Sequence, residues 1–206
     1  MWFQKSHIKI QKPFIPIEDL HGYVLPHAGT FHTKKILNST LRFSPTKDFK
    51  KIIIIYYPAN LEENIILEKK SYYHEFYVIF KIMKYMCSKI WNKKKIKIIG
   101  KNIRDKSFNH KYNNENLYIV SADFSHFKPL KYAIEKENCA AQCILYRSLN
   151  NNSSCLNEID HPKSFKVLFS FLPKNFMLQW IGRSRSSGEK GVGYLSFLIT
   201  NPKIKK

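Results

Sequence analysis

Histidine and aspartate side chains directly follow two predicted buried strands. His27 lies in a Pro-His-Ala-Gly turn after Tyr23–Leu25, and Asp123 and His126 lie in an Asp-Phe-Ser-His turn after Leu117–Val120. Because open α/β sheets collect their functional sites at strand ends, the two turns can meet at one place. Imidazole nitrogens and carboxylate oxygens are ligands of iron, zinc and copper in proteins. The residue types therefore predict a shared metal site, with His27, Asp123 and His126 as candidate catalytic residues.

Each turn also has a structural interpretation. A single histidine after a strand is commonly a loop residue, and Asp123 can be the N-cap of a helix with His126 on the surface. Asp123 can also orient a histidine ligand from outside the coordination sphere. Taken singly, the turns are explained more simply by structure; their occurrence together raises the odds of a shared site, but spacing alone does not decide between the two interpretations.

Two further groups of residues have alternative readings. Arg183 and Arg185 form an arginine cluster that either binds a phosphate or other anion or belongs to a solvated turn between strands. Cys139 and Cys143 have helical spacing, so they either bind a metal together or pack as small apolar residues. The sequence contains no nucleotide-binding loop, dinucleotide glycine fingerprint, serine nucleophile elbow or zinc-knuckle spacing.

The elements that position these turns follow from hydrophobic patterning. Residues 51–57 are β-branched and aromatic and predict a buried strand, and residues 71–90 have apolar positions at helical spacing. The other predicted strands are 23–25, 95–100, 117–120, 176–182 and 191–200, and the other predicted helices are 33–41, 129–149 and the segment that follows His161 and Pro162 up to Leu172. This alternation predicts an α/β sandwich with a central, mostly parallel or mixed sheet flanked by helices.

Length and composition predict one globular domain. The chain has 206 residues, of which 44% are hydrophobic and 15% aromatic, and these values exclude a disordered protein. No internal repeat or long linker divides the sequence. We expect a single domain over residues 1–206, with a core over about residues 20–200 and a basic tail over residues 201–206.

The net charge of +20 is high, but what it implies depends on whether lysine or arginine carries it. Thirty of the 35 basic residues are lysine and only five are arginine, while isoleucine and asparagine are also abundant. Lysine, isoleucine and asparagine share A/T-rich codons, so base composition can raise all three together. A nucleic-acid-binding surface more often favours arginine, whose planar fork matches phosphate and guanine. Compositional drift is therefore the preferred explanation, with nucleic-acid binding retained as an alternative.

The sequence also bears on where the protein works. The first residues lack the continuous apolar segment of a secretory signal, and no apolar run approaches the length of a membrane span. Four cysteines in a chain of this size do not resemble a disulfide scaffold. We therefore expect no membrane association and a reducing, cytoplasmic setting, with the nucleus as an alternative.

The same motifs resemble those of the Memo family (mediator of ErbB2-driven cell motility), which includes the AmmeMemoRadiSam system protein B members. The Pro-His-Ala-Gly and Asp-Phe-Ser-His turns occur in the family's order, and residues 51–59 are similar to its strand followed by Gly-Pro-Ser-His. Residues 184–195 are similar to its terminal serine-rich segment. The resemblance implies a fold similar to class III extradiol dioxygenases and a pocket that binds copper or iron. His27, Asp123 and His126 match the family's site positions.

The departures from the family pattern concern the ligands. Asn60 stands where the family has a histidine, and Glu158 stands where it has a cysteine if His161 and Pro162 are aligned. Residues 70–73 lack the family's second histidine and its glutamate. A site built from His27, Asp123, His126 and Glu158 would have only nitrogen and oxygen ligands, which favours iron, manganese or zinc over copper(I).

Three hypotheses remain from the sequence. The first is a divergent, lysine-rich Memo-like protein with a partly degenerate metal pocket and, if it is an enzyme, metal-dependent oxidoreductase chemistry of a dioxygenase-like kind. The second is a non-enzymatic scaffold that binds a peptide or phosphopeptide of a protein partner in the same pocket or at Arg183 and Arg185. The third is a basic nucleic-acid-binding protein.

Overall fold

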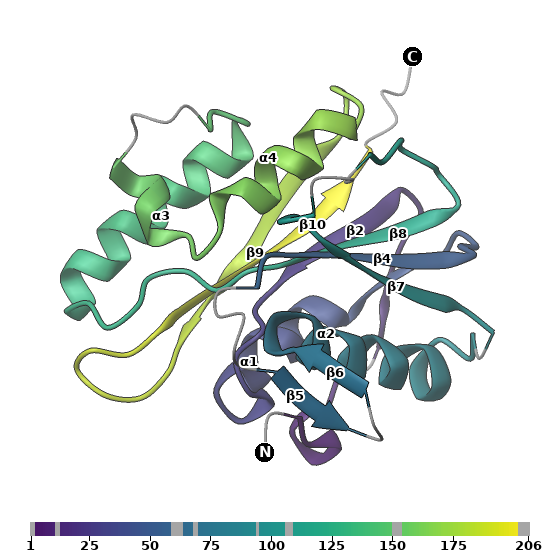
Figure 1. The fold of residues 1–206 in the computed structure, drawn as a ribbon, viewed down its shortest axis with the longest axis horizontal. Coiled ribbons are helices and arrows are strands. Elements are labelled where there is room, and N and C mark those ends of the chain that lie inside the picture. The colour runs from purple at the N-terminus through teal and green to yellow at the C-terminus, as the bar shows by residue number, and fades with distance from the viewer. Residues whose placement is uncertain are drawn as a thin grey trace.

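A six-stranded mixed sheet forms the centre of the molecule (Figure 1). The computed structural model describes residues 3–10, 13–58, 64–67, 70–93, 95–105, 109–149 and 154–201. The strand order is β7-β4-β8-β2-β10-β9, in which β7, β4, β8 and β2 are parallel and β10 and β9 are antiparallel to their neighbours. These strands are β2 (Leu20–Leu25), β4 (Lys51–Tyr56), β7 (Lys97–Asn102), β8 (Asn116–Ser121), β9 (Met177–Arg185) and β10 (Gly193–Thr200).

Helices cover both faces of this sheet, which confirms the α/β sandwich. Figure 1 shows α3 (Leu130–Leu145) and α4 (Pro162–Phe171) on one face and α1 (Thr30–Leu41) and α2 (His74–Tyr85) on the other. Successive strand residues point to opposite faces, so Ile53 and Ile55 pack with α3 and α4, whereas Ile52 and Ile54 pack with α1 and α2. Because both faces are covered, all four isoleucines are buried, and each contributes about 1.5–3 kcal/mol of transfer free energy.

Several short elements were not predicted from the sequence. Strand β1 (Ile15–Ile17) pairs in parallel with β3 (Phe43–Pro45), and β5 (Asn64–Leu67) pairs antiparallel with β6 (Lys70–Tyr73). The prediction of one helix over 71–90 is therefore wrong at its start: β6 runs to Tyr73, and α2 begins at His74. Past Tyr85 the chain continues as a π-helical turn, η2 (Met86–Ile90). The remaining short helices are η1 (Lys5–His7) and η3 (Ser154–Glu158).

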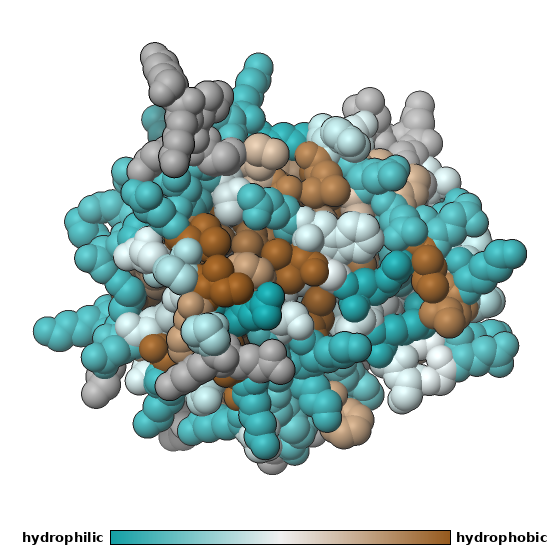
Figure 2. Space-filling view, turned by 180° about the vertical axis from the view of Figure 1, so that it is seen from behind, coloured by the Kyte–Doolittle hydropathy of each residue, from teal (hydrophilic) through white to brown (hydrophobic). Residues whose placement is uncertain are grey.

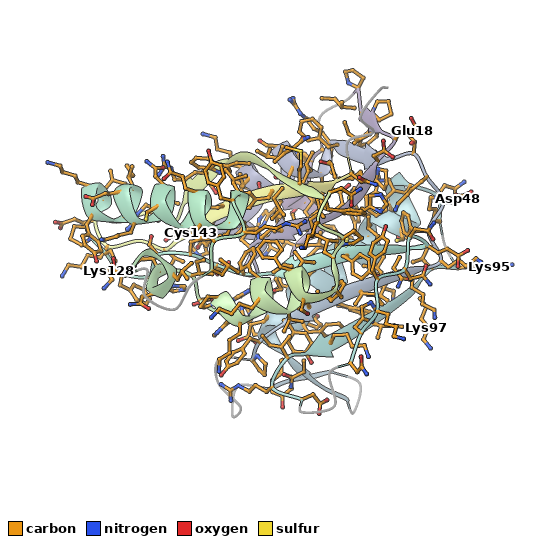
Figure 3. The ribbon with its side chains drawn as sticks, turned by 90° about the horizontal axis from the view of Figure 1, so that it is seen from above. Glu18, Asp48, Lys95, Lys97, Lys128 and Cys143 are labelled. Atoms are coloured by element: carbon orange, nitrogen blue, oxygen red, sulfur yellow. The ribbon has the colours of Figure 1, made fainter. Side chains whose placement is uncertain are left out.

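The strand directions bring several loops to one edge of the sheet. The parallel strands β2, β4, β7 and β8 all end there, and β10 begins there because it runs the opposite way. Figure 3 shows Asp48, Lys95 and Lys97, which precede or begin β4 and β7, at one end of the molecule and Lys128, which follows β8, toward the other. Residues just after the ends of β2 and β8 therefore meet, as expected for a site in an open α/β sheet.

On the face seen in Figure 2, hydrophilic side chains border a central group of hydrophobic ones. Among the helices that the structure describes, none has the length and apolar character needed to cross a bilayer.

Cys139 is disulfide-bonded, so the prediction of a metal-binding pair with Cys143 loses one of its two thiols. Cys143 is partly buried against the core beneath α3 and α4.

Candidate metal centre

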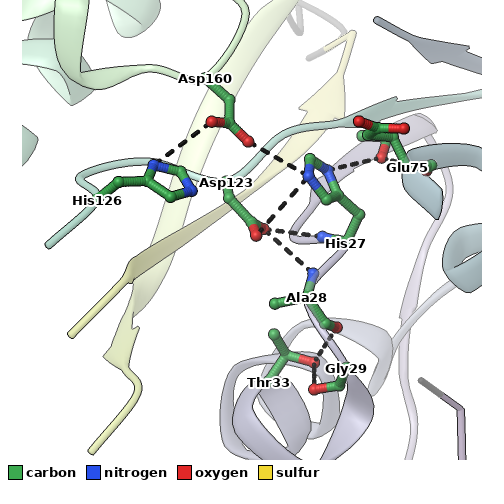
Figure 4. Close-up of polar contacts among 9 residues, drawn as sticks. His27, Ala28, Gly29, Thr33, Glu75, Asp123, His126 and Asp160 are labelled. Atoms are coloured by element: carbon green, nitrogen blue, oxygen red, sulfur yellow. Dashed lines mark hydrogen bonds and ion pairs between the residues drawn. The ribbon is translucent and has the colours of Figure 1, made fainter. Parts of the chain in front are cut away.

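Three side chains converge at the carboxyl edge of the sheet: His27 after β2, Asp123 after β8 and Asp160 before α4 (Figure 4). The Nε2 atom of His27 lies 3.8 Å from Oδ2 of Asp123 and 3.3 Å from Oδ2 of Asp160. One ligand atom from each residue lies within 4.8 Å of the others. Ligands bonded to one ion at about 2.0–2.2 Å lie within about 4.4 Å of each other. The group can therefore hold one metal ion with little movement.

The other face of the His27 ring is held by a chain of hydrogen bonds. The Ser121 hydroxyl donates to the carbonyl oxygen of Glu75 at 2.6 Å, so its proton is already committed. Its oxygen therefore accepts a hydrogen bond from Nδ1–H of His27, at 3.1 Å. With the proton on Nδ1, the lone pair of neutral His27 is on Nε2, which faces the two carboxylates. Metal-binding histidines are commonly oriented in this way.

Asp123 is oriented by the backbone of the first turn. Its Oδ1 accepts hydrogen bonds from the backbone N–H groups of His27 at 2.9 Å and Ala28 at 3.4 Å, which leaves Oδ2 facing the imidazole (Figure 4). The hydroxyl of Thr33, in the first turn of α1, donates to the carbonyl oxygens of Ala28 and Gly29, each at 3.3 Å. The backbone from His27 to Gly29 is therefore held both to the turn after β8 and to the start of α1.

Asp160 connects the centre to His126. Its backbone N–H donates to the carbonyl oxygen of Asp123 at 3.2 Å, and its Oδ1 lies 3.4 Å from Nδ1 of His126. The Asp160 and His126 side chains are 20% and 36% exposed, whereas those of His27 and Asp123 are 6% and 5% exposed. Solvent or a ligand therefore reaches the centre from the side of Asp160 and His126.

The electrostatics of the centre favour an imidazolium between two carboxylates when no metal is bound. Burial by itself lowers the pKa of His27, but the charges of Asp123 and Asp160 outweigh it and raise the pKa to about 9. Burial raises the pKa of Asp123, while contacts with the surrounding histidines outweigh burial at Asp160 and lower its pKa. Burial lowers the pKa of His74 and His161 to about 4, so both rings are neutral at neutral pH. A metal ion and a proton therefore compete for Nε2 of His27.

A buried ion-pair network holds the loop that carries Asp123 and His126. Glu137, on α3, is 1% exposed and accepts a hydrogen bond from the Ser125 hydroxyl. Arg183 and Arg185, on β9, each place a guanidinium nitrogen 3.5 Å from the Glu137 carboxylate, and Arg185 also donates to Ser125 Oγ at 3.2 Å. At Gly193 a Cβ atom would lie 1.9 Å from Glu137 Oε1, so a larger residue there would displace the Glu137 carboxylate from the network. Both arginines thus serve the fold; anion binding by them stays a prediction.

The structure brings together part of the ligand set predicted from the sequence. His27 and Asp123 belong to the converging group, and His126 contacts it through Asp160. Glu158 is buried and lines a cavity of about 530 Å³ with His126 and Asp160, but it lies outside the three-residue group. Asn60 lies outside the described residues. His126 and Glu158 therefore stay predictions as metal ligands.

Asp160 was missed by sequence reasoning. It directly precedes His161 and Pro162, and Pro162 is the first residue of α4. An acidic residue just before a proline-initiated helix is a usable signal for a side chain near a helix start. The alignment with the family's Cys-Gly-x-His-Pro segment directed attention to Glu158 instead, two residues too early.

The sequence matches no protein-family model and no curated protein. Fold and site together therefore define the class of protein: an α/β sandwich with a His-Asp-Asp group, able to hold a metal ion, at the carboxyl edge of its sheet.

Proposed function

We propose that this chain is a Memo-like metalloprotein that binds one divalent ion through His27 Nε2, Asp123 Oδ2 and Asp160 Oδ2. The observation that carries the proposal is the placement of the His27 ring. Its Nδ1 is committed to Ser121, and its Nε2 lies 3.3–3.8 Å from two carboxylate oxygens. The spacing and the tautomer both suit a metal ligand.

The donor set favours a metal that accepts nitrogen and oxygen ligands. One imidazole and two carboxylates, without a thiolate, suit iron(II), manganese(II) or zinc better than copper(I). Two carboxylates also neutralise the charge of a divalent ion in a site where His27 and Asp123 are buried. A bound iron or manganese ion would supply the redox chemistry that the Memo resemblance implies.

A second buried nitrogen supports a ligand at this edge of the sheet. Nε2 of His161 is buried and has no hydrogen-bond partner among the described residues. Buried polar groups are nearly always paired, so an unpaired ring nitrogen next to Asp160 calls for an explanation such as a bound ion or water. We include His161 as a candidate contact of the ion or of its bound water.

The test is metal content with matched variants. Protein purified anaerobically and then dialysed against Fe²⁺, Mn²⁺ or Zn²⁺ should retain about one equivalent by elemental analysis. His27→Ala and Asp123→Asn should lose it, whereas His32→Ala, an exposed histidine on α1, should retain it. Retention of the same metal in His27→Ala would disprove this assignment.

The alternative is a non-enzymatic binding scaffold with the same fold. In that case His27 is a permanent imidazolium that joins Asp123 and Asp160 as a structural ion triad. The cavity of about 530 Å³ beside His126 is the specific feature that favours this version, because it leaves room for a peptide side chain. Protein that stays metal-free on titration but remains folded would support the scaffold.

A further inference from the structure

A second cavity shares Asp160 with the candidate metal centre. It has a volume of about 400 Å³ and is lined by Tyr57, Arg104, Asp160, His161, Pro162 and Lys163. These residues come from the ends of β4 and β7 and from the start of α4, which are far apart in sequence. The volume is in the range of small-molecule sites.

The lining of this cavity is cationic. Among the lining residues that the structure describes, Arg104 and Lys163 contribute two positive charges and Asp160 one negative charge, so their formal net charge is +1. Helix α4 also begins in the cavity wall and has no acidic residue in its first turn, so its positive end adds to the field. The cavity is therefore suited to a monoanion.

The two cations are arranged around one aromatic ring. The Arg104 guanidinium lies 4.4 Å from the centre of the Tyr57 ring, and Nζ of Lys163 lies 5.9 Å from it. The His161 ring stacks on Tyr57 at 4.3 Å between centroids, with 25° between the planes. Stacking limits the motion of the guanidinium, so less entropy is lost when it binds an anion. The ring pair supplies an apolar wall beside the cations.

We propose that this cavity binds the carboxylate of a small organic acid, held by Arg104 and Lys163, next to the metal centre. The placement beside the metal rests on the proposed function, because Asp160 is both a wall of the cavity and a proposed ligand. A carboxylate matches the planar fork of arginine and carries the single negative charge that the lining balances. A phosphate monoester carries nearly two negative charges and exceeds that balance.

The probe is 3,3,3-trifluoropropionate, followed by ¹⁹F NMR in a titration of the full chain without metal. We expect saturable binding that weakens about three- to tenfold in Arg104→Gln and in Lys163→Gln. Lys131→Gln, an exposed lysine on α3, is the matched control for the high net charge and should leave affinity unchanged. Equal weakening in Lys131→Gln, or no weakening in the cavity variants, would overturn the proposal.

Two further probes separate the chemistry of the ligand. The neutral analogue 3,3,3-trifluoropropanol should not compete, because it lacks the charge that the cavity recognises. Inorganic phosphate should compete only weakly. Competition by phosphate at lower concentration than by acetate would overturn the carboxylate assignment in favour of a phosphate site.

Loading with Mn²⁺ then tests the placement beside the metal. We expect Mn²⁺ to enhance ¹⁹F relaxation of the bound probe in the wild-type chain and not in His27→Ala, where the probe should still bind. Probe binding without Mn²⁺ uptake would reject the proposed function and leave the carboxylate site standing. Mn²⁺ uptake without probe binding would reject the carboxylate site and leave the metal site standing.

Discussion

Metal binding should release the proton that His27 holds between the two aspartates. With its pKa raised to about 9 by Asp123 and Asp160, His27 is about 99% protonated at pH 7, and a metal can bind Nε2 only after that proton leaves. The apparent affinity for a divalent ion should therefore rise about tenfold between pH 7 and pH 8, and about fivefold between pH 8 and pH 9, where half of the His27 rings are already deprotonated. From pH 7 to pH 9 the total gain is about 50-fold.

Isothermal titration calorimetry with Mn²⁺ measures this directly. At pH 7, titrations in two buffers of different ionisation enthalpy should give close to one proton released for each ion bound. The number of protons released for each ion bound should fall toward one half as the pH approaches 9. His32→Ala should behave as the wild-type chain does, because this exposed side chain lies outside the centre.

One outcome would contradict the assignment of His27 as a ligand. If Mn²⁺ binds with the same affinity at pH 7 and pH 8.5 and without proton release, the ion does not displace a proton from His27. The ring would then be either a neutral bystander or a permanent imidazolium, and the ligand assignment would fail.

Three further predictions concern the centre and the network that supports its loop. In the metal-free chain, the pKa of His27 is higher in the folded than in the unfolded state, so protonated His27 stabilises the fold fully below about pH 6.5. The free energy of unfolding should therefore fall by about 3 kcal/mol as the pH rises to 9, and this fall should be absent in His27→Gln. If urea titrations give a difference in unfolding free energy between the wild-type chain and His27→Gln that does not change with pH, this reasoning is refuted. Glu137→Gln should lower the free energy of unfolding by about 3 kcal/mol, against less than about 0.5 kcal/mol for the exposed control Glu135→Gln, because it breaks a buried ion-pair network. Asp160→Asn should weaken Mn²⁺ binding about 100-fold and lower the pKa of His27 in an NMR titration, and an unchanged pKa would show that Asp160 does not set it.

The central sheet could be predicted because its strands are strongly patterned. The isoleucines of β4 are buried on both faces of the sheet, so in the sequence they form a continuous apolar run instead of an alternation of apolar and polar residues. The short pairs β1–β3 and β5–β6 were missed because strands of three or four residues carry little periodic signal and depend on their partners. Because residues 70–73 pair with β5, α2 begins only at His74. The tyrosines at positions 72 and 73 also favour a strand over a helix.

The site was predictable where a strand end determines the position of a side chain. His27 and Asp123 follow β2 and β8, which are hydrogen-bonded neighbours in parallel register, so their convergence follows from topology. Asp160 comes from an irregular connection between η3 and α4, 37 residues beyond Asp123, and reaches the centre through a tertiary hydrogen bond from its backbone N–H to the Asp123 carbonyl oxygen. No periodicity in the sequence encodes such a contact.

The net charge of +20 has no part in the geometry of the centre. The lysines that produce most of it are absent from the converging group, which consists of one histidine and two aspartates. Arg183 and Arg185 pair with the buried carboxylate of Glu137 and support the loop that carries Asp123 and His126, whereas Arg104 and Lys163 line the cavity that shares Asp160 with the centre. The net charge therefore bears little on the ligand set of the centre itself.

The most direct measurement is anomalous X-ray diffraction from crystals of the full chain grown with Mn²⁺. We expect one strong anomalous peak about 2.0–2.3 Å from Nε2 of His27, Oδ2 of Asp123 and Oδ2 of Asp160. No peak at this position, with His27 still between the two carboxylates at the distances of the metal-free chain, would contradict the proposal and identify the group as a structural ion triad.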